Sequence, residues 1–172
     1  MLTNNGYTIR DVRLEELDAV ADVILAAYEQ YKVAMPPEVW EAYSRDIVDV
    51  RARIANAQLI VAEQDRKILG AVTFFADGSK GENWPPGHTC IRLLAVSPEA
   101  RGMGVGRALM EECIHRSHVL GALQVGLHTT EMMAVALAMY VRMGFTRAPE
   151  FDFNPAPGIT VAAFRFALGR PD

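Results

Sequence analysis

The sequence lacks the features that mark several classes of protein. Only two of its 172 residues are cysteines, Cys90 and Cys113, and they form no CxxC pair. We therefore expect reduced core thiols and no disulfide. No apolar stretch approaches the roughly 20 residues of a membrane helix. Residues Met1–Arg10 show no basic-then-apolar signal pattern, so a cytoplasmic location is the default prediction.

Concentrated positive charge is also missing. The 17 Lys and Arg are outnumbered by 21 Asp and Glu, and the formal net charge is −4. Nucleic acid is therefore disfavoured as a principal partner, since phosphate binding needs a clustered basic surface. A small amine or a peptide end suits this balance better. No metal is expected, because His115 and His118, spaced i, i+3, have no third ligand in sight.

The apolar periodicity predicts one α/β domain over residues 1–172, with neither repeats nor a linker. A βαβ crossover around a glycine-rich segment and hairpins elsewhere predict a mixed sheet of about seven strands with helices on both faces. Asp65-Arg66 reads as a hairpin turn, Ala76–Gly87 as a mobile surface loop, and Thr129 or Thr130 as a helix cap. The expected strands are Tyr7–Val12, Gln58–Glu63, Lys67–Phe75, Thr89–Val96, Leu123–Leu127, Phe151–Phe153 and Ile159–Leu168. The expected helices run from Leu14 to Tyr31, from Val39 to Ile54, from Val105 to Gly121 and from Glu131 to Met143.

The most informative segment is Arg101-Gly102-Met103-Gly104-Val105-Gly106, between an apolar strand and a predicted helix. Its glycines allow tight turns and close approach to the main chain, while the first N–H groups of the helix point outward at the positive end of the dipole. This is the geometry of a pyrophosphate cradle. A dinucleotide fingerprint fails, because it needs glycine where Arg107 stands, and no Gly-Lys-Ser/Thr triplet supports a P-loop.

The pattern Arg101-x-x-Gly104-x-Gly106 after Leu94-Ala95-Val96-Ser97-Pro98-Glu99 resembles the acyl-CoA pyrophosphate loop of the GNAT superfamily of acyl-CoA-dependent N-acyltransferases. A second match lies about forty residues on. Ala136-Leu137-Ala138-Met139-Tyr140-Val141-Arg142-Met143-Gly144-Phe145 resembles the family's A-x-x-x-Y-x-x-x-G-F helix. Both motifs occur in the family's order and spacing, and the resemblance extends more loosely over nearly the whole chain.

The resemblance implies a splayed central strand pair and transfer of an acetyl group from acetyl-CoA to a primary amine of a small molecule or peptide, by direct attack in a ternary complex. It implies that a backbone amide near Leu94 is the oxyanion donor and that Tyr140 protonates the departing thiolate. It also points to a homodimer. The implied coenzyme A contacts are Leu94, Ala95, Val96, Arg101, Gly102, Met103, Gly104, Val105, Gly106, Arg107 and Tyr140.

The sequence departs from the family at the general base. Many relatives carry a glutamate on the strand before the loop, but Thr89-Cys90-Ile91-Arg92 holds no carboxylate, and Met132-Met133 replaces a frequent asparagine. The candidates left for base or substrate contact are His128, His88, Glu131 and Arg92, with a water relay as an alternative to a side-chain base. Arg92 would favour a substrate bearing a carboxylate. The missing glutamate keeps open a non-catalytic acyl-CoA-binding or sensor domain, and a third hypothesis is an interaction domain without a nucleotide ligand.

Overall fold

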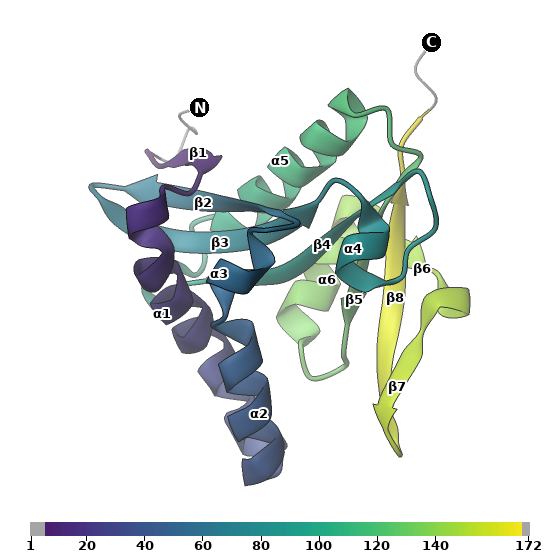
Figure 1. The fold of residues 1–172 in the computed structure, drawn as a ribbon, viewed down its shortest axis with the longest axis horizontal. Coiled ribbons are helices and arrows are strands. Elements are labelled where there is room, and N and C mark those ends of the chain that lie inside the picture. The colour runs from purple at the N-terminus through teal and green to yellow at the C-terminus, as the bar shows by residue number, and fades with distance from the viewer. Residues whose placement is uncertain (1–5, 170–172) are drawn as a thin grey trace. The chain divides into compact units, whose positions relative to one another are not determined.

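The structure is a computed structural model that describes residues 6–169. Contacts within the chain group into two compact units. Unit 1 holds the residues up to Phe74 together with Leu93–Cys113, and unit 2 holds Phe75–Arg92 and the residues from Ile114 onward. The division falls before the last residue of strand β3 (Lys67–Phe75), inside strand β4 (His88–Val96) and inside helix α5 (Val105–Val119). Figure 1 labels these three elements. The expectation of a single domain stays a prediction.

Unit 1 contains an antiparallel ribbon of three strands. Strand β1 (Thr8–Asp11) pairs with β2 (Gln58–Gln64), and β2 pairs with β3 (Lys67–Phe75). The turn between β2 and β3 is Asp65-Arg66, with φ of 50° and 65°. Positive φ at both positions is the requirement of a type I′ hairpin turn, so the predicted hairpin is confirmed.

Five helical segments lie between β1 and β2: η1 (Leu14–Glu16), α1 (Leu17–Tyr28), η2 (Glu29–Ala34), α2 (Pro37–Ile47) and α3 (Val50–Arg53). The predicted helix from Val39 to Ile54 is therefore wrong in its extent. The Asp49 carboxylate accepts a hydrogen bond from the Ala52 N–H at 3.3 Å, which starts a new helix where the apolar spacing alone predicts continuation.

The interior of unit 1 is built on β2 and β3. Leu59–Ala62 and Gly70–Phe75 are buried at every position, which requires cover on both faces of the ribbon. Helix α5 supplies close cover at Gly70, where an added Cβ would stand 2.8 Å from Val105 Cγ1. The start of α5 is thus fixed against β3 by a glycine that permits close approach.

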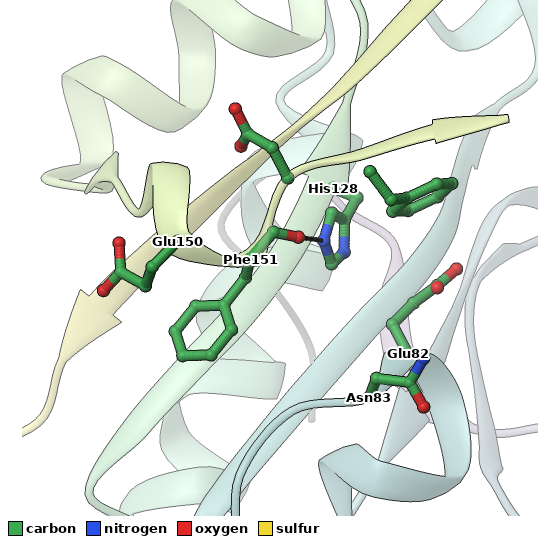
Figure 2. Close-up of a pocket in the computed structure, with 7 residues that line it drawn as sticks. Glu82, Asn83, His128, Glu150 and Phe151 are labelled. Carbon is green, nitrogen blue, oxygen red and sulfur yellow. Dashed lines mark hydrogen bonds between the residues drawn. The ribbon is translucent and has the colours of Figure 1, made fainter. Parts of the chain in front are cut away.

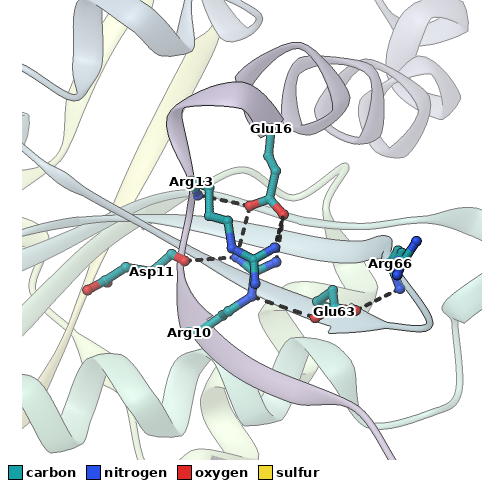
Figure 3. A network of polar contacts seen from close by, with 6 residues as sticks. All are labelled: Arg10, Asp11, Arg13, Glu16, Glu63 and Arg66. Carbon is teal, nitrogen blue, oxygen red and sulfur yellow. Dashed lines mark hydrogen bonds and ion pairs between the residues drawn. The ribbon is translucent and has the colours of Figure 1, made fainter.

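A network of ion pairs ties β1 to the segment that follows it (Figure 3). The Arg10 guanidinium donates to both carboxylate oxygens of Glu16, at 2.8 and 2.7 Å, and the Arg13 N–H donates to the same carboxylate at 2.8 Å. Glu63 lies 3.7 Å from Arg10 and accepts the Arg66 N–H at 2.7 Å. The hydrogen bond from Arg10 is the main cause that lowers the pKa of Glu16 to about 2.

Unit 2 contains a mixed sheet. The first part of β4 runs parallel to β5 (Gln124–Thr129), and β5 pairs antiparallel with β8 (Ile159–Ala167). Strand β8 also pairs with two short strands, β6 (Thr146–Arg147) and β7 (Phe153–Ala156). The remaining segments are α4 (Gly78–Glu82), η3 (Pro98–Ala100), which belongs to unit 1, α6 (Ala134–Met143) and η4 (Pro149–Phe151). The predicted α/β class with a mixed sheet is confirmed, with eight strands among residues 6–169.

The prediction of a surface loop at Ala76–Gly87 is wrong in part, because the segment lies at the surface but contains a short helix and a buried side chain. The segment contains α4, capped by the Asp77 carboxylate, which accepts the Ser79 N–H at 3.1 Å. Trp84 in the same segment is only 2% exposed. Three glycines and two prolines give the segment the composition of a loop, and most of it is exposed, while the buried Trp84 side chain anchors it to unit 2.

The predicted cap of the Tyr140 helix is also wrong. Helix α6 begins at Ala134, and its N-cap is Met133, which makes no side-chain cap hydrogen bond. The Met133 N–H donates to the Thr130 carbonyl at 3.0 Å, which closes a turn before the helix and leaves Glu131 outside it. Gly144 ends α6 in the predicted left-handed conformation, with φ of 102°.

Within residues 6–169, no helix combines the length and the hydropathy needed to cross a bilayer.

Candidate active site

The glycine turn of unit 1 leads directly into α5. Gly102 and Gly104 have φ of 80° and 79°, a region that L side chains rarely adopt. The Met103 N–H donates to the Ala100 carbonyl at 3.3 Å, and the first helical bond runs from the Ala108 N–H to the Gly104 carbonyl at 3.0 Å. Helix geometry therefore leaves the N–H groups from Gly104 to Arg107 without acceptors inside α5. These outward donors at the positive end of the helix dipole fit a pyrophosphate.

The two arginines of this turn differ in their partners. Arg107 Nε lies 2.7 Å from Glu111 Oε1, one turn further along α5, so its charge is partly offset. Arg101 ends η3 and is exposed. Burial raises the pKa of the nearby Tyr31, and the positive charge of Arg101 partly opposes this rise. Arg101 can therefore add more to the positive potential at the start of α5 than Arg107 can.

Strand β4 carries an irregularity just before the segment predicted to hold pantetheine. Leu93 has φ of 52°, which is unusual for a residue with a branched side chain and turns the backbone locally. The Tyr28 hydroxyl, from the end of α1, donates to the Leu94 carbonyl at 3.1 Å. This contact fixes the peptide group between Leu94 and Ala95, and Ala95 is 1% exposed.

The parallel pairing of β4 with β5 is short. It covers four residue pairs, from His88 with Gln124 to Ile91 with Leu127, although both strands continue beyond the last pair. Arg92 and His128 are the first residues of their strands past that point. A parallel pair that stops inside two continuing strands is consistent with the splayed pair implied by the family resemblance.

One face of this β4–β5 pair carries alternate residues of both strands: His88, Cys90, Arg92, Gln124, Gly126 and His128. The Trp84 indole covers the face, with its ring centroid 5.8 Å from that of His88 and 5.3 Å from that of His128. Three of the four side chains predicted as base or substrate contacts are therefore gathered on one face. The fourth, Glu131, is exposed on the turn before α6.

His128 also lines a pocket of about 510 Å³ in unit 2 (Figure 2). Its Nε2 lies 2.8 Å from the Phe151 carbonyl oxygen. The pocket walls come from the end of α4, from β5 and from the segment of η4 that leads into β7. Its lining residues are Glu82, Asn83, His128, Glu150, Phe151, Asp152 and Phe153.

Arg92 is engaged within its own unit. Its Nε lies 3.0 Å from Glu82 Oε1, and the side chain of Arg92 is 33% exposed. A substrate carboxylate at Arg92 would compete with Glu82, so the ion pair weakens the case for that contact. The pairing was not visible in the sequence, because Glu82 lies in the segment predicted as a loop.

Tyr140 lies on α6 in unit 2 and is 7% exposed. Its ring centroid is 5.9 Å from that of Phe145, which follows the Gly144 cap. The Phe145 N–H donates to the Tyr140 carbonyl at 3.0 Å. The glycine and phenylalanine of the family motif thus hold the last turn of α6 and the tyrosine ring.

The thiols are poor nucleophiles in the fold. Cys90 and Cys113 are both free and buried, as predicted. Burial is the main cause that raises the pKa of the Cys90 thiol to about 12, and Glu82 adds to the effect. Cys90 therefore stays protonated at neutral pH and is not suited to carry an acyl group. Among residues 6–169, no group of three His, Cys, Asp or Glu side chains is arranged to hold a metal ion.

Some residues of interest were missed from the sequence. Tyr28 at the Leu94 carbonyl, Phe151 at His128 and the positive φ of Leu93 carry no local signal, because each depends on a contact or backbone turn between distant segments. Asp152 was missed for the same reason. It pairs with Arg147 at 2.7 Å on the wall of the pocket.

Comparison with known proteins identifies the class. Residues 22–145 match the model of the acetyltransferase (GNAT) family. Because this match covers most of the 172 residues, the chain belongs to that family. The resemblance found in the two sequence motifs is thereby confirmed.

Individual relatives are acetyltransferases by name. The chain is 34% identical over 118 residues to a mycothiol acetyltransferase of Cellulomonas flavigena, a match that covers 63% of the chain and 34% of that protein. It is 29% identical over 101 residues to an uncharacterized N-acetyltransferase of Schizosaccharomyces pombe, covering 59% of the chain and 58% of that protein. The chain thus spans between about a third and three fifths of the length of these relatives.

The fold is that of solved acetyltransferases. The crystal structure of PaiA N-acetyltransferase from Thermoplasma acidophilum, in complex with coenzyme A, matches with a TM-score of 0.75. The match covers 94% of this chain and 99% of that chain at 16% sequence identity. At this identity, the comparison establishes a shared fold.

Proposed function

We propose that the chain is an N-acetyltransferase that moves an acetyl group from acetyl-CoA to a primary amine of a small molecule or peptide. The observation that carries the proposal is the row of outward N–H groups from Gly104 to Arg107, set behind two glycines with positive φ. Membership of the GNAT family and relatives named as acetyltransferases support it.

The binding of coenzyme A would use both main chain and side chains. The amides from Gly104 to Arg107 would bind the pyrophosphate, and each charge-assisted hydrogen bond contributes about 1.5–3 kcal/mol. Arg101 would add positive potential, and Arg107 would add less because of its pairing with Glu111. The pantetheine amides would bind the backbone of Leu94, Ala95 and Val96.

The chemistry would be direct attack of the amine on the thioester. The Leu94 N–H would stabilise the oxyanion, and the next peptide group, between Leu94 and Ala95, is held by the Tyr28 hydroxyl. Tyr140 would protonate the departing thiolate, because a phenol is protonated at neutral pH and a thiolate is basic. A covalent acyl-enzyme is not expected, since the Cys90 thiol stays protonated.

Thiol release tests the proposal. Purified protein with acetyl-CoA and a panel of amines, amino acids, peptides and aminoglycosides should release free coenzyme A thiol with at least one acceptor. Binding of acetyl-CoA with no release for any acceptor would favour the rival function, a non-catalytic acyl-CoA sensor. No thermal shift with coenzyme A would remove both functions and favour the interaction domain.

The wider setting is also part of the proposal. We expect a single-domain cytoplasmic enzyme that needs no metal, acts on a small-molecule or peptide amine, and forms a homodimer. Its acceptor would not be nucleic acid or a membrane. Light scattering on the eluted protein would test the dimer, and turnover in the presence of a chelator would test independence from metal.

A further inference from the structure

We propose that His128 is the proton acceptor of this transfer, through its Nδ1 atom, and that the Phe151 carbonyl fixes the ring in the required tautomer. The inference rests on the proposed acetyltransferase function. It selects one group from those that the sequence leaves open, which are His128, His88, Glu131 and a water relay.

The tautomer follows from the contact with Phe151. A carbonyl oxygen only accepts hydrogen bonds, so at 2.8 Å the Nε2 atom of His128 carries the hydrogen. In the neutral ring the lone pair is then on Nδ1. This Nδ1 is buried and has no hydrogen-bond partner among the residues that the structure describes. A buried ring nitrogen without a partner is costly unless a ligand or a water satisfies it.

The position of His128 suits an approaching amine. It is the first residue of β5 beyond the last β4–β5 pair, where the resemblance places the opening between the strands. It also lines the 510 Å³ pocket, so the ring is reachable from outside (Figure 2). A molecule in this pocket would meet the half-buried His128 ring, and a small shift of that ring would bring the buried Nδ1 to it.

Three carboxylates line the pocket together with His128. Asp152, Glu150 and Glu82 line the same pocket and contribute carboxylates from the η4–β7 segment and from α4. The Arg147 hydrogen bond is the main cause that lowers the pKa of Asp152 to about 2, and His128 adds a smaller effect in the same direction. Asp152 is therefore ionised at neutral pH and places a carboxylate on the wall of the pocket that His128 lines.

Three arginines near the pocket each form an ion pair with one of its carboxylates. Arg92 pairs with Glu82, Arg147 with Asp152 and Arg165 with Glu150. His88 stacks on the Trp84 indole, and its Nε2 lies 3.0 Å from the Gln124 side-chain oxygen. It is at the start of the paired part of β4, outside this pocket, and Glu131 is also absent from the pocket wall. Neither shares the position of His128.

The step balances in protons and bonds. The amine nitrogen forms a bond to the thioester carbon, and the carbon–sulfur bond breaks. The proton lost by the nitrogen goes to His128 Nδ1, and the thiolate takes a proton from Tyr140. Exchange with solvent then removes the proton from His128 and returns one to Tyr140.

The central variant is His128→Gln. A glutamine amide can still donate to the Phe151 carbonyl, but it cannot accept a proton near neutral pH. We expect kcat/KM to fall by about 10²–10⁴-fold, the usual contribution of a general base. The affinity for coenzyme A and the melting temperature should remain close to those of the wild type.

Matched controls separate this role from a structural one. His118→Gln changes an exposed histidine of α5 and should leave turnover unchanged. Turnover of His128→Gln equal to that of the wild type would overturn the inference. A loss confined to His88→Gln would overturn it as well.

The tautomer has an independent test that needs no turnover. Nitrogen-15 shifts of the His128 ring at high pH should show hydrogen on Nε2, and a ring with hydrogen on Nδ1 would contradict the proposal. Turnover measurements also distinguish a failure of the transferase function from a failure of the role given to His128. If the wild-type protein releases no thiol with any amine, the transferase function and this inference both fail. If the wild type is active and His128→Gln is equally active, only the inference fails.

Discussion

The indole of Trp84 lies directly against Gly126, so that a Cβ at position 126 would stand 2.2 Å from Trp84 Cε2. We expect Gly126→Ala to lower the free energy of unfolding by about 1–3 kcal/mol, because either the indole or the strand must shift. Urea unfolding measures this change. Gly169→Ala, with nothing within 4 Å of the added Cβ, is the matched control and should be neutral. Equal midpoints for the two variants would contradict the packing described.

Tyr140→Phe keeps the ring that packs 5.9 Å from Phe145 and removes only the hydroxyl. We expect release of coenzyme A thiol to slow by about 10²-fold or more, the lower end for general acid catalysis, with little change in stability. Steady-state thiol detection measures it. Tyr43→Phe, in the aromatic cluster with Tyr28 and Trp40, is the control and should turn over normally. Unchanged turnover in Tyr140→Phe would remove this hydroxyl from the mechanism.

Gly104→Ala places a side chain on a backbone with φ of 79°. The strain should cost about 1 kcal/mol of stability, and it should also displace the first N–H groups of α5 and weaken binding of coenzyme A by tenfold or more. Calorimetric titration measures the affinity. Gly158→Ala, with φ of 78° in the β7–β8 turn, carries the same strain and should bind normally. Equal affinities for both variants would argue against the pyrophosphate cradle.

The contact between Glu16 and Arg10 should make the free energy of unfolding depend on pH. Its pKa is about 2 in the fold and is ordinarily 4.5, so the Arg10–Glu16 contact stabilises the fold above pH 4.5 and is lost as the pH falls toward 2. Glu16→Gln should therefore cost about 1–2 kcal/mol at pH 7 and little near pH 2. Urea unfolding across this range measures the difference. Glu41→Gln, in an exposed pair with Arg45, should have almost no effect at either pH.

We expect both cysteine thiols to react slowly with thiol reagents in the native protein. Cys90 and Cys113 are 0% exposed, and burial raises the pKa of the Cys90 thiol to about 12. A disulfide reagent should titrate no thiol rapidly in native protein and two after unfolding in guanidinium. The release of coenzyme A can then be followed without a protein background. A rapid native thiol would contradict the burial described.

The sequence predicted the parts of the candidate site that are local in the chain. The glycines with positive φ before α5, and Gly144 at the end of the Tyr140 helix, stand where short-range backbone rules require them. The type I′ turn at Asp65-Arg66 follows from the same kind of rule.

The parts that could not be predicted depend on contacts between distant segments. His128 was a candidate from its residue type, but its partner Phe151 lies 23 positions further along the chain. Trp84 was assigned to a loop because the composition of a segment reflects only residues close in sequence. Its indole packs against Gly126, which is distant in the chain. Strand β6 is two residues long, too short to show any periodicity.

Neither compact unit is a continuous piece of chain, because β4 changes unit after Arg92 and α5 changes unit after Cys113. On the ribosome, the N-terminal half therefore cannot finish folding when β3 emerges. Unit 1 can fold completely only after Cys113 has been synthesised. Until unit 2 is complete, Phe75–Arg92 remains an unfolded insertion. A nascent chain arrested before that point should remain sensitive to protease.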